Sequence, residues 1–534
     1  MKKFILFPAL LLSLLASGQE AWRQGLKYRL QVKLDDKQKT LEGSMDLRYT
    51  NHSPDTLHFI WFHVWPNAYR NDRTGYSEQL LENGKTGFYF SDKESKGYIN
   101  RLEFRVNGIM ADIQDHPEYI DVIKLILPAA LAPGDSIRVD ASFHEKLPYN
   151  FSGYGFRGHN FQVSNWYPEP AVYDREGWHT MPFLEQGGAY HEAADYEVGI
   201  DVPDTYTLAA GNSADTVLRQ DNSDIKTYRF SLRKANSFAW IAGQRLTEKK
   251  DTVQLETGKQ IRLNMYYFRR DSSLMQDQLG LSKSYIRQLS SLVSEYPYSS
   301  LTLIETLQPQ EQSFSGMILM DVPGLYKNPE RILRRALAAQ WFQAICLSDE
   351  RLNPWMSGGF IRYYDQRLQP NPTPSRYQKH RVLDDRIWLR VAEREKTAQP
   401  IRTPAEKMSP ENYSLIAGTK SALWIKSLED SLGEIKFDRG MRSYFEKWKF
   451  GHPGPEDYKA AMEESGGIHL DSEFEELNTT RSLFPAGPKK MLKPAYGFSR
   501  INQDKYNYIN IAPAFGYNRY DDFMIGAIVH NYTL

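Results

Sequence analysis

The spacing of apolar residues changes partway along the chain, and this change constrains the fold more than any other feature. Residues 28–34 and 196–202 alternate apolar and polar side chains, which is typical of strands with one buried face. In residues 279–293, 330–347 and 421–448 the spacing lengthens to a helical period. The sequence therefore predicts an α+β multidomain protein, in which an N-terminal antiparallel β domain precedes a mixed, mainly helical domain.

Composition excludes several classes of protein. Lys plus Arg and Asp plus Glu both number 66 in the 534 residues, so a nucleic-acid binder that acts through bulk positive charge is not expected. Hydrophobic residues make up 41%, which indicates a folded chain. Cys346 is the one cysteine, so an internal disulfide and a cysteine-based zinc site are both excluded.

The N-terminus has the pattern of an export signal. Residues 4–16 form an apolar run of 13 residues after two lysines, and this run is shorter than the ~20 residues that a membrane-spanning helix needs. Ala16 and Gly18 have the small-x-small spacing of a signal-peptidase site. We interpret residues 1–18 as a cleaved signal that directs the chain to the periplasm or outer membrane; the alternative is a short membrane anchor.

Three segments in the helical half share the spacing of a known motif set. They read SGMILM at 315–320, RALAAQWF at 335–342 and WMSGGF at 355–360. They resemble the aminopeptidase-N-like family of gluzincin metallopeptidases, in its secreted Bacteroidota form, whose motifs are G-[GA]-M-E, H-E-x-x-H-Q-W-F and W-L-x-E-G. The register holds without a gap at five positions, which are Gln340, Trp341, Phe342, Trp355 and Gly359.

The resemblance covers roughly residues 25 to 484 and carries expectations about fold and ligand. It implies an N-terminal β domain at 19–248 and a thermolysin-like peptidase-type domain at 249–484. In the family, zinc is the cofactor, and an extended peptide binds by adding a strand to a sheet edge, a mode that requires no metal.

The strand-like tail at 485–534 resembles the opening of a C-terminal outer-membrane β-barrel. Two strands cannot close a barrel. The chain is therefore expected either to be a truncated piece of a longer protein or to pack its tail on the preceding domain.

The metal-binding positions of the family are occupied here by residues without suitable donors. Under the resemblance the three zinc ligands fall on Arg335, Ala339 and Gly358. Ala and Gly have no side-chain donor atoms, and a guanidinium does not deprotonate to become one. A positive charge ~4 Å from a dication repels it by roughly 8 kcal/mol at an effective permittivity of ~20. We therefore expect no zinc cofactor.

The remaining chemical positions are also changed. The general base falls on Ala336, the amine-binding Glu on Ile318 and the transition-state Tyr on Gly418, two residues before Lys420. Loss of a general base typically lowers a rate by ~10²–10⁴, and loss of the metal removes water activation as well. The sequence predicts a degenerate catalytic site with no catalytic residue at these positions.

The other potentially reactive side chains have ordinary structural interpretations. His191 and Glu192 form a degenerate H-E-x-x-D with Asp195, which we interpret as an ordinary surface pair because the segment reads as loop into strand. Cys346 lies on the apolar side of its helix, which favours a buried, inert thiol. A G-x-S-x-G nucleophile elbow is missing from the sequence.

A basic cluster shares the helix of the lost ligands. Arg331 and Arg335 are four residues apart and share a helical face, with Arg334 beside them. One interpretation is a solvated face paired with Glu330 or nearby acids. The other is that Arg335 points into the former cleft and offers its guanidinium to a carboxylate of a peptide. Met317 and Trp341 are further candidates for lining that cleft.

These observations leave three functional hypotheses. The first is a non-catalytic relative of the zinc aminopeptidases that binds an extended peptide or a partner in the cell envelope. The second is an active zinc aminopeptidase with unconventional ligands, which requires three donors that the sequence does not reveal. The third is a structural periplasmic module that positions an outer-membrane barrel.

Overall fold

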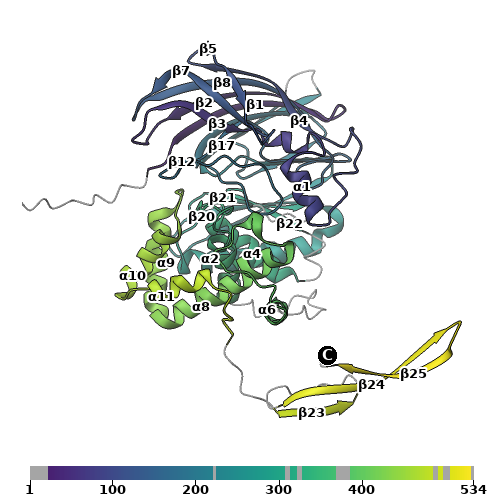
Figure 1. The fold of residues 1–534 in the computed structure, drawn as a ribbon. Coiled ribbons are helices and arrows are strands. Elements are labelled where there is room, and N and C mark those ends of the chain that lie inside the picture. Colours follow the sequence, from purple (N-terminus) through teal and green to yellow (C-terminus); the bar gives the residue numbers. More distant parts are fainter. Residues whose placement is uncertain are drawn as a thin grey trace, which may run out of the picture. The chain divides into compact units, whose positions relative to one another are not determined.

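The structure is a computed structural model that describes residues 22–219, 224–306, 313–321, 328–368, 385–484, 491–496 and 506–530. The predicted signal at 1–18 lies outside the described residues. The chain forms two compact units, Met1–Thr480 and Arg481–Leu534, and each is described by itself. Figure 1 shows the strands and helices of both units in chain order.

The N-terminal part of the first unit is built on an eight-stranded sheet. In spatial order its strands are β16 (Thr216–Arg219), β17 (Ile225–Ala235), β14 (Ala194–Pro203), β1 (Gly25–Asp35), β2 (Thr40–Thr50), β8 (Ser136–Lys146), β4 (Tyr98–Val106) and β5 (Ile109–Met110). Among these described strands every neighbouring pair is antiparallel except β1 and β14, which run parallel. Parallel pairing needs a long crossover, and the residues between β1 and β14 supply the rest of this β-rich part.

Alternation along the strands produces one buried face, as predicted. Every second residue of β1 is buried. On this face the ring of Tyr28 contacts Tyr167, a loop residue, at 5.2 Å. Phe104 contacts Phe62 of a smaller sheet at 5.2 Å, and the described residues of the β-rich part form two such four-stranded sheets. Their strands are β3 (Leu57–His63), β6 (Ile113–Asp115), β7 (Val122–Leu131), β11 (Glu169–Pro170), β9 (Gly155–Arg157), β10 (Asn160–Val163), β15 (Thr207–Ala210) and β18 (Trp240–Gly243).

Short elements lie beside these sheets. They are the 3₁₀ turn η1 (Trp65–Tyr69), the helix α1 (Gly75–Glu82) and the ribbon of β12 (Tyr173–Asp174) with β13 (Gly177–Trp178). Thr74 caps α1, because its side chain accepts a hydrogen bond from the Ser77 amide.

A second sheet lies next to the helices. Its order is β19 (Leu246–Gln254), β20 (Gln260–Phe268), β21 (Ser300–Thr306) and β22 (Met317–Asp321), with parallel pairing of β20 to β21 and of β21 to β22. Figure 1 shows β20 to β22 between the β-rich part and the helices. The expected boundary between residues 248 and 249 falls inside β19, which is one continuous strand of this second sheet.

The helical part follows the predicted pattern with two differences. Its α-helices are α2 (Ser272–Leu292), α4 (Pro329–Phe342), α5 (Trp355–Arg367), α6 (Asp385–Arg394), α7 (Pro410–Asn412), α8 (Ser421–Leu432), α9 (Glu434–Trp448), α10 (Pro455–Gly466) and α11 (Asp471–Glu475). The turns η2 (Arg269–Asp271), η3 (Ala405–Lys407) and η5 (Glu476–Asn478) are 3₁₀, and η4 (Tyr413–Lys420) is a π-helix.

The differences concern where two helices end. The expected helix 330–347 ends at Phe342. The expected helix 421–448 is two helices, because Gly433 adopts a φ of +80° that α-helical backbone does not allow. None of the described helices combines the length and hydropathy that a membrane-spanning helix requires.

The second unit is a three-stranded sheet. Strand β24 (Tyr506–Asn518) pairs with β23 (Met491–Tyr496) in parallel and with β25 (Asp522–His530) in antiparallel orientation. The predicted strands 507–513 and 523–530 lie within β24 and β25. Large apolar side chains such as Phe515 and Ile525 are exposed on this sheet.

A charged network joins the β-rich part to the helical part within the first unit. The His179 ring places Nε2 2.8 Å from Asp174 Oδ1 and Nδ1 3.5 Å from Asp349 Oδ2. Burial disfavours the charged imidazole, but hydrogen bonds and charges from Asp174 and Asp349 outweigh burial and raise the pKa of His179 to about 10. The protonated ring therefore links a loop of the β-rich part to the segment after α4.

This raised pKa predicts how stability depends on pH. The folded state holds the His179 proton more tightly than the unfolded state, so the stabilisation is complete below about pH 6.5 and disappears as the pH rises toward 10. We expect His179→Gln to lower the free energy of unfolding by about 2 kcal/mol at pH 6 and by less at pH 10, as measured by urea unfolding. His469→Gln, at a 93% exposed side chain, is the control; a loss of equal size at both pH values would contradict the prediction.

Candidate arginine–aspartate site

The helices α4 and α5 carry the three positions onto which the resemblance maps the family's zinc ligands. Arg335 and Ala339 lie one turn apart on α4, and Gly358 lies in the first turn of α5. Asn328 starts α4, since its side chain accepts a hydrogen bond from the Arg331 amide. The local sequence therefore forms helices at these positions, and the three side chains there have no metal-donor atoms.

Arg335 is held by carboxylates of the chain itself. Its Nε donates to Asp365 Oδ2 at 2.8 Å, and the Nε of Arg334 donates to Asp365 Oδ1 at the same distance. Asp365 is buried in α5, while the Arg335 side chain keeps 24% of its surface exposed. Two neighbouring arginines of α4 thus share the two oxygens of one carboxylate on α5.

A second aspartate connects a third helix. Asp385, the first residue of α6, accepts at Oδ2 from Arg362 Nη1 at 2.6 Å and lies 3.5 Å from Arg335 Nη2. Arg331 of α4 also pairs with this oxygen. The name arginine–aspartate network hereafter denotes the side chains of Arg331, Arg334, Arg335, Arg362, Asp365 and Asp385. They link α4, α5 and α6 through charge-assisted hydrogen bonds.

The interpretation of the arginine cluster as a solvated face is wrong about the exposure of its side chains. The arginines pair with nearby acids, as that interpretation required, and Arg334 lies 3.7 Å from Glu330. Their side chains are largely buried, however. Burial raises the pKa of Asp365 even though Arg334 lowers it, and burial lowers the pKa of Arg362 even though Asp385 raises it. The network is therefore desolvated, and removing either partner of a pair would leave a poorly hydrated charge.

The position of the third ligand has no room for a side chain. A Cβ on Gly358 would lie 2.9 Å from the carbonyl oxygen of Ala417 and 3.2 Å from its carbonyl carbon. These atoms belong to the backbone of the π-helix η4. At Gly418, in the same element, a Cβ would lie 3.2 Å from Cγ and Nε of Arg362. The arginine side chain thus covers the position of the family tyrosine.

These residues do not fit a zinc ion. The ligand positions offer a guanidinium, a methyl group and a hydrogen atom, none of which donates an electron pair to a metal. Within the described ranges, no three His, Cys, Asp or Glu side chains are grouped so that they could hold a metal ion.

The other predicted site residues lie in the interior. Ile318, Met317 and Trp341 are buried, and the Trp341 indole donates to the Ser294 carbonyl at 2.8 Å. The candidate binding residues were Arg335, Met317 and Trp341, and of these Arg335 is the one with a partly exposed side chain. Ala336 is half-buried on α4.

Gln340 has a structural role that its place in the motif does not reveal. Its Nε2 donates to the carbonyls of Phe314 and Met317, both at 3.0 Å, and its Oε1 accepts from the Gly316 amide at 3.1 Å. These bonds tie α4 to the start of β22. The motif residue Gln340 therefore has a packing role between α4 and β22 that does not depend on zinc.

A cavity of about 530 Å³ lies between the β-rich and helical parts of the first unit. Aromatic rings of Trp65, Phe151 and Phe183 form part of its lining, and its polar groups include Gln343, Glu350, Arg351, Tyr413 and Ser414. Sequence reasoning missed this cavity, because its lining comes from segments far apart in the chain. The sequence offers one local signal for this cavity, which is the Gly187–Gly188 pair. In the structure Gly187 adopts a φ of +79°.

The cavity and the network touch at Ser414. The Ser414 hydroxyl accepts a hydrogen bond from Arg362 Nη2 at 3.0 Å, and Ser414 lines the cavity. Arg362 in turn holds Asp385. A ligand in the cavity would therefore lie one side chain away from the arginine–aspartate network.

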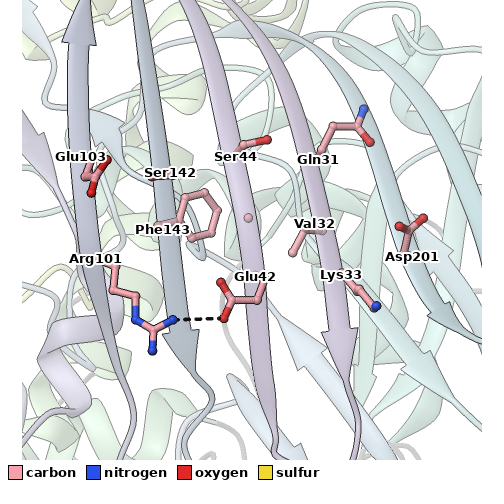
Figure 2. A pocket seen from close by; sticks show the side chains of 11 residues that line it. Gln31, Val32, Lys33, Glu42, Ser44, Arg101, Glu103, Ser142, Phe143 and Asp201 are labelled. Carbon is pink, nitrogen blue, oxygen red and sulfur yellow. Dashed lines mark ion pairs between the residues drawn. The ribbon is translucent and has the colours of Figure 1, made fainter. Parts of the chain in front are cut away.

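A second depression, of about 450 Å³, lies on the exposed face of the eight-stranded sheet. Figure 2 shows its polar side chains on neighbouring strands, with Arg101 Nη1 3.7 Å from Glu42 Oε1. It contains none of the positions discussed above.

The expectation that His191 and Glu192 form a surface pair is wrong. Both are buried. His191 Nδ1 lies 2.8 Å from Glu169 Oε2, and Glu192 Oε2 lies 2.9 Å from the His452 ring. Burial lowers the pKa of His452, but Glu192 outweighs burial and raises it. The pair fastens the β-rich part to the segment after α9.

The expectation that Cys346 is a buried thiol is confirmed, but Cys346 follows the end of α4 and does not lie on the helix. The thiol is buried beside the Tyr444 hydroxyl, at 3.7 Å. Burial raises the pKa of Cys346 to about 12, so it stays a thiol at neutral pH.

Sequence comparison finds distant aminopeptidase relatives. No protein-family model matches the sequence. Human endoplasmic reticulum aminopeptidase 2 is 24% identical over 254 residues, which cover 40% of this chain and 26% of that protein. Mitochondrial aminopeptidase 2 of Saccharomyces cerevisiae is 25% identical over 147 residues, covering 26% of this chain and 15% of the relative. The chain thus spans about a quarter or less of the length of these relatives.

Solved structures share the fold over most of the chain. The M1 zinc metallopeptidase of Deinococcus radiodurans superposes with a TM-score of 0.61 at 16% identity, over 87% of this chain and 95% of that one. A mutant of the same enzyme bound to the substrate Tyr-Ser-Ala gives a TM-score of 0.60, with 87% and 96% covered. The expected α+β architecture is confirmed. The aminopeptidase relatives and the shared fold support the resemblance to the aminopeptidase-N-like gluzincin metallopeptidases.

Proposed function

We propose that this chain is a non-catalytic relative of the zinc aminopeptidases and that it binds an extended peptide or a partner of the cell envelope. The observation that supports loss of catalysis is the arginine–aspartate network at the family's zinc position. Arg335 brings a positive charge where a dication would sit, and the backbone of Ala417 fills the space beside Gly358.

Peptide hydrolysis requires functions that these positions do not provide. A zinc aminopeptidase polarises the peptide carbonyl, activates water and stabilises the tetrahedral oxyanion. Ala336 has no group to accept a proton, and Gly418 has no hydroxyl to donate a hydrogen bond. The alternative of an active enzyme with unconventional ligands gains no specific observation from these residues.

The cavity supports a binding role. Its volume of about 530 Å³ lies within the usual range for ligand pockets. Aromatic rings on one part of its lining suit an apolar side chain, and amide, hydroxyl and charged groups on another suit a peptide backbone. The structural relative from Deinococcus radiodurans binds Tyr-Ser-Ala, and we propose that a short peptide segment of similar size occupies the cavity here. The export pattern of residues 1–18 supports a ligand in the periplasm or at the outer membrane.

Metal content and hydrolysis test the loss of catalysis. We expect the chain, purified without added chelator, to hold far less than one zinc per molecule by elemental analysis, because its ligand positions have no donors. We also expect no release of free amino acids from Tyr-Ser-Ala above the rate in buffer. An active family member assayed in parallel is the positive control. Stoichiometric zinc together with EDTA-sensitive hydrolysis would refute this part of the proposal.

The crowding at Gly358 is testable by a pair of identical substitutions. Gly358→Ala in α5 forces a methyl group against the Ala417 carbonyl, so we expect it to destabilise the protein by about 1–3 kcal/mol. Gly280→Ala in α2 meets no atom within 4 Å and is expected to stabilise the helix by up to about 1 kcal/mol. Thermal unfolding of both variants measures the difference. Equal effects of the same sign would show that position 358 has room for a side chain.

Filling the cavity tests the binding role. Ala189 lines the cavity, so we expect Ala189→Trp to weaken binding of fluorescently labelled Tyr-Ser-Ala about tenfold or more, equivalent to about 1.4 kcal/mol. The matched control is Ser44→Trp, which fills the depression of Figure 2 instead. Fluorescence anisotropy gives both dissociation constants. Unchanged affinity of the Ala189 variant would show that the peptide binds elsewhere.

A further inference from the structure

Three guanidinium groups converge on a single oxygen atom in the arginine–aspartate network. Oδ2 of Asp385 pairs with Arg362 Nη1 at 2.6 Å, with Arg335 Nη2 at 3.5 Å and with Arg331. Each guanidinium carries about five N–H donors, whereas a carboxylate oxygen offers about two lone pairs. The donors around Asp385 therefore exceed the acceptors that this carboxylate supplies.

The charges are also unequal. The network contains the guanidinium groups of Arg331, Arg334, Arg335 and Arg362. Among the residues that the structure describes, the carboxylates paired with them are Glu330, Asp365 and Asp385. One positive charge is left unbalanced within this group. Since the side chains are largely buried, this charge is screened less by solvent than a surface charge would be.

One of these arginines, Arg362, is hydrogen-bonded to a residue of the cavity lining. The side chains of Arg331, Arg335 and Arg362 keep between 17% and 24% of their surface exposed. Arg362 donates to Ser414 at 3.0 Å, and Ser414 forms part of the cavity lining. An acidic group on a ligand in the cavity could therefore approach Arg362 by taking the place of the Ser414 hydroxyl.

We propose that Arg331, Arg335 and Arg362 form a carboxylate-binding site for an acidic peptide, and that Asp385 is a built-in competitor that occupies this site. The inference rests on the proposed peptide-binding function and adds the chemical class of the ligand. Asp385 lowers the apparent affinity for an external carboxylate, because only molecules with a displaced Asp385 leave all three arginines free to bind. The unbalanced positive charge favours a ligand that adds one negative charge.

Three labelled peptides separate charge from general peptide binding. The first is acetyl-Tyr-Ser-Ala-amide, which is neutral. The second is acetyl-Tyr-Ser-Ala with a free C-terminal carboxylate, and the third is acetyl-Tyr-Ser-Asp-amide, whose carboxylate is on a side chain. The two acidic peptides distinguish a C-terminus from an acidic side chain as the source of the carboxylate.

Removing the internal carboxylate should strengthen binding of acidic peptides selectively. We expect Asp385→Asn, which keeps the size of the side chain but removes its charge, to bind at least one acidic peptide about tenfold more tightly than the unmodified chain. The neutral peptide should bind equally well to both. The control is Asp438→Asn, which breaks an ion pair with Arg367 in the same helical part and should leave all affinities unchanged. Adding Arg362→Met to Asp385→Asn should abolish the gain.

A measurement on the unmodified chain guards against loss of folding in the variants. We expect the preferred acidic peptide to bind about threefold more tightly than the neutral one at low salt, and this preference to disappear at 1 M salt. The proposal is overturned if the acidic peptides have no preference in the unmodified chain and none in Asp385→Asn. Equal binding of all three peptides would leave the peptide-binding function intact and remove the acidic specificity, whereas binding of none would overturn both.

Discussion

The pairing of arginines on α4 with aspartates on α5 and α6 is the interaction on which the rest of this site depends. In the active family a dication would bind between α4 and α5. Here Asp365 bridges the same helices, and Asp385 adds a third helix. A set of oppositely charged side chains can thus link the helices without a metal. Because these charges are largely buried, their geometry is constrained as closely as that of a core.

Backbone packing complements the charge network. The π-helix η4 lies against α5, where Gly358 admits the carbonyl of Ala417, and Gly418 admits the side chain of Arg362. Two residues without side chains therefore allow a close approach that a glutamate and a tyrosine would prevent. A donor side chain placed at one of the three mapped ligand positions would leave the other two without donors, and position 358 has no space for one.

Much of the scaffold is nevertheless kept. Gln340 ties α4 to the start of β22 through hydrogen bonds with Phe314, Gly316 and Met317. Trp341 and Trp355 are fully buried. The polar pairs His179–Asp349 and Glu192–His452 hold the β-rich part against the helical part. Separate interactions, outside the arginine–aspartate network, therefore maintain the fold.

Local patterns were sufficient for part of this description. Alternation in residues 28–34 predicted β1, and helical spacing predicted α2, because each reflects which side of one element is buried. Boundaries were less accurate: α4 ends at Phe342, and Gly433 separates α8 from α9. The missing ligands at Arg335, Ala339 and Gly358 were also visible in the sequence, because the absence of a donor atom is a property of the residue itself.

Partners across long distances in the chain required the tertiary structure. The sequence by itself determined that the residues onto which the resemblance maps the zinc ligands have no donors, and it favoured a buried thiol at Cys346. It did not determine that Asp365 and Asp385 hold the arginines, that His191 and Glu192 are buried, or that a cavity lies beside Ser414. The physical reason is that residue type and local periodicity are encoded over a few turns of chain. Charge pairing and burial depend instead on which distant segments the folded core brings together.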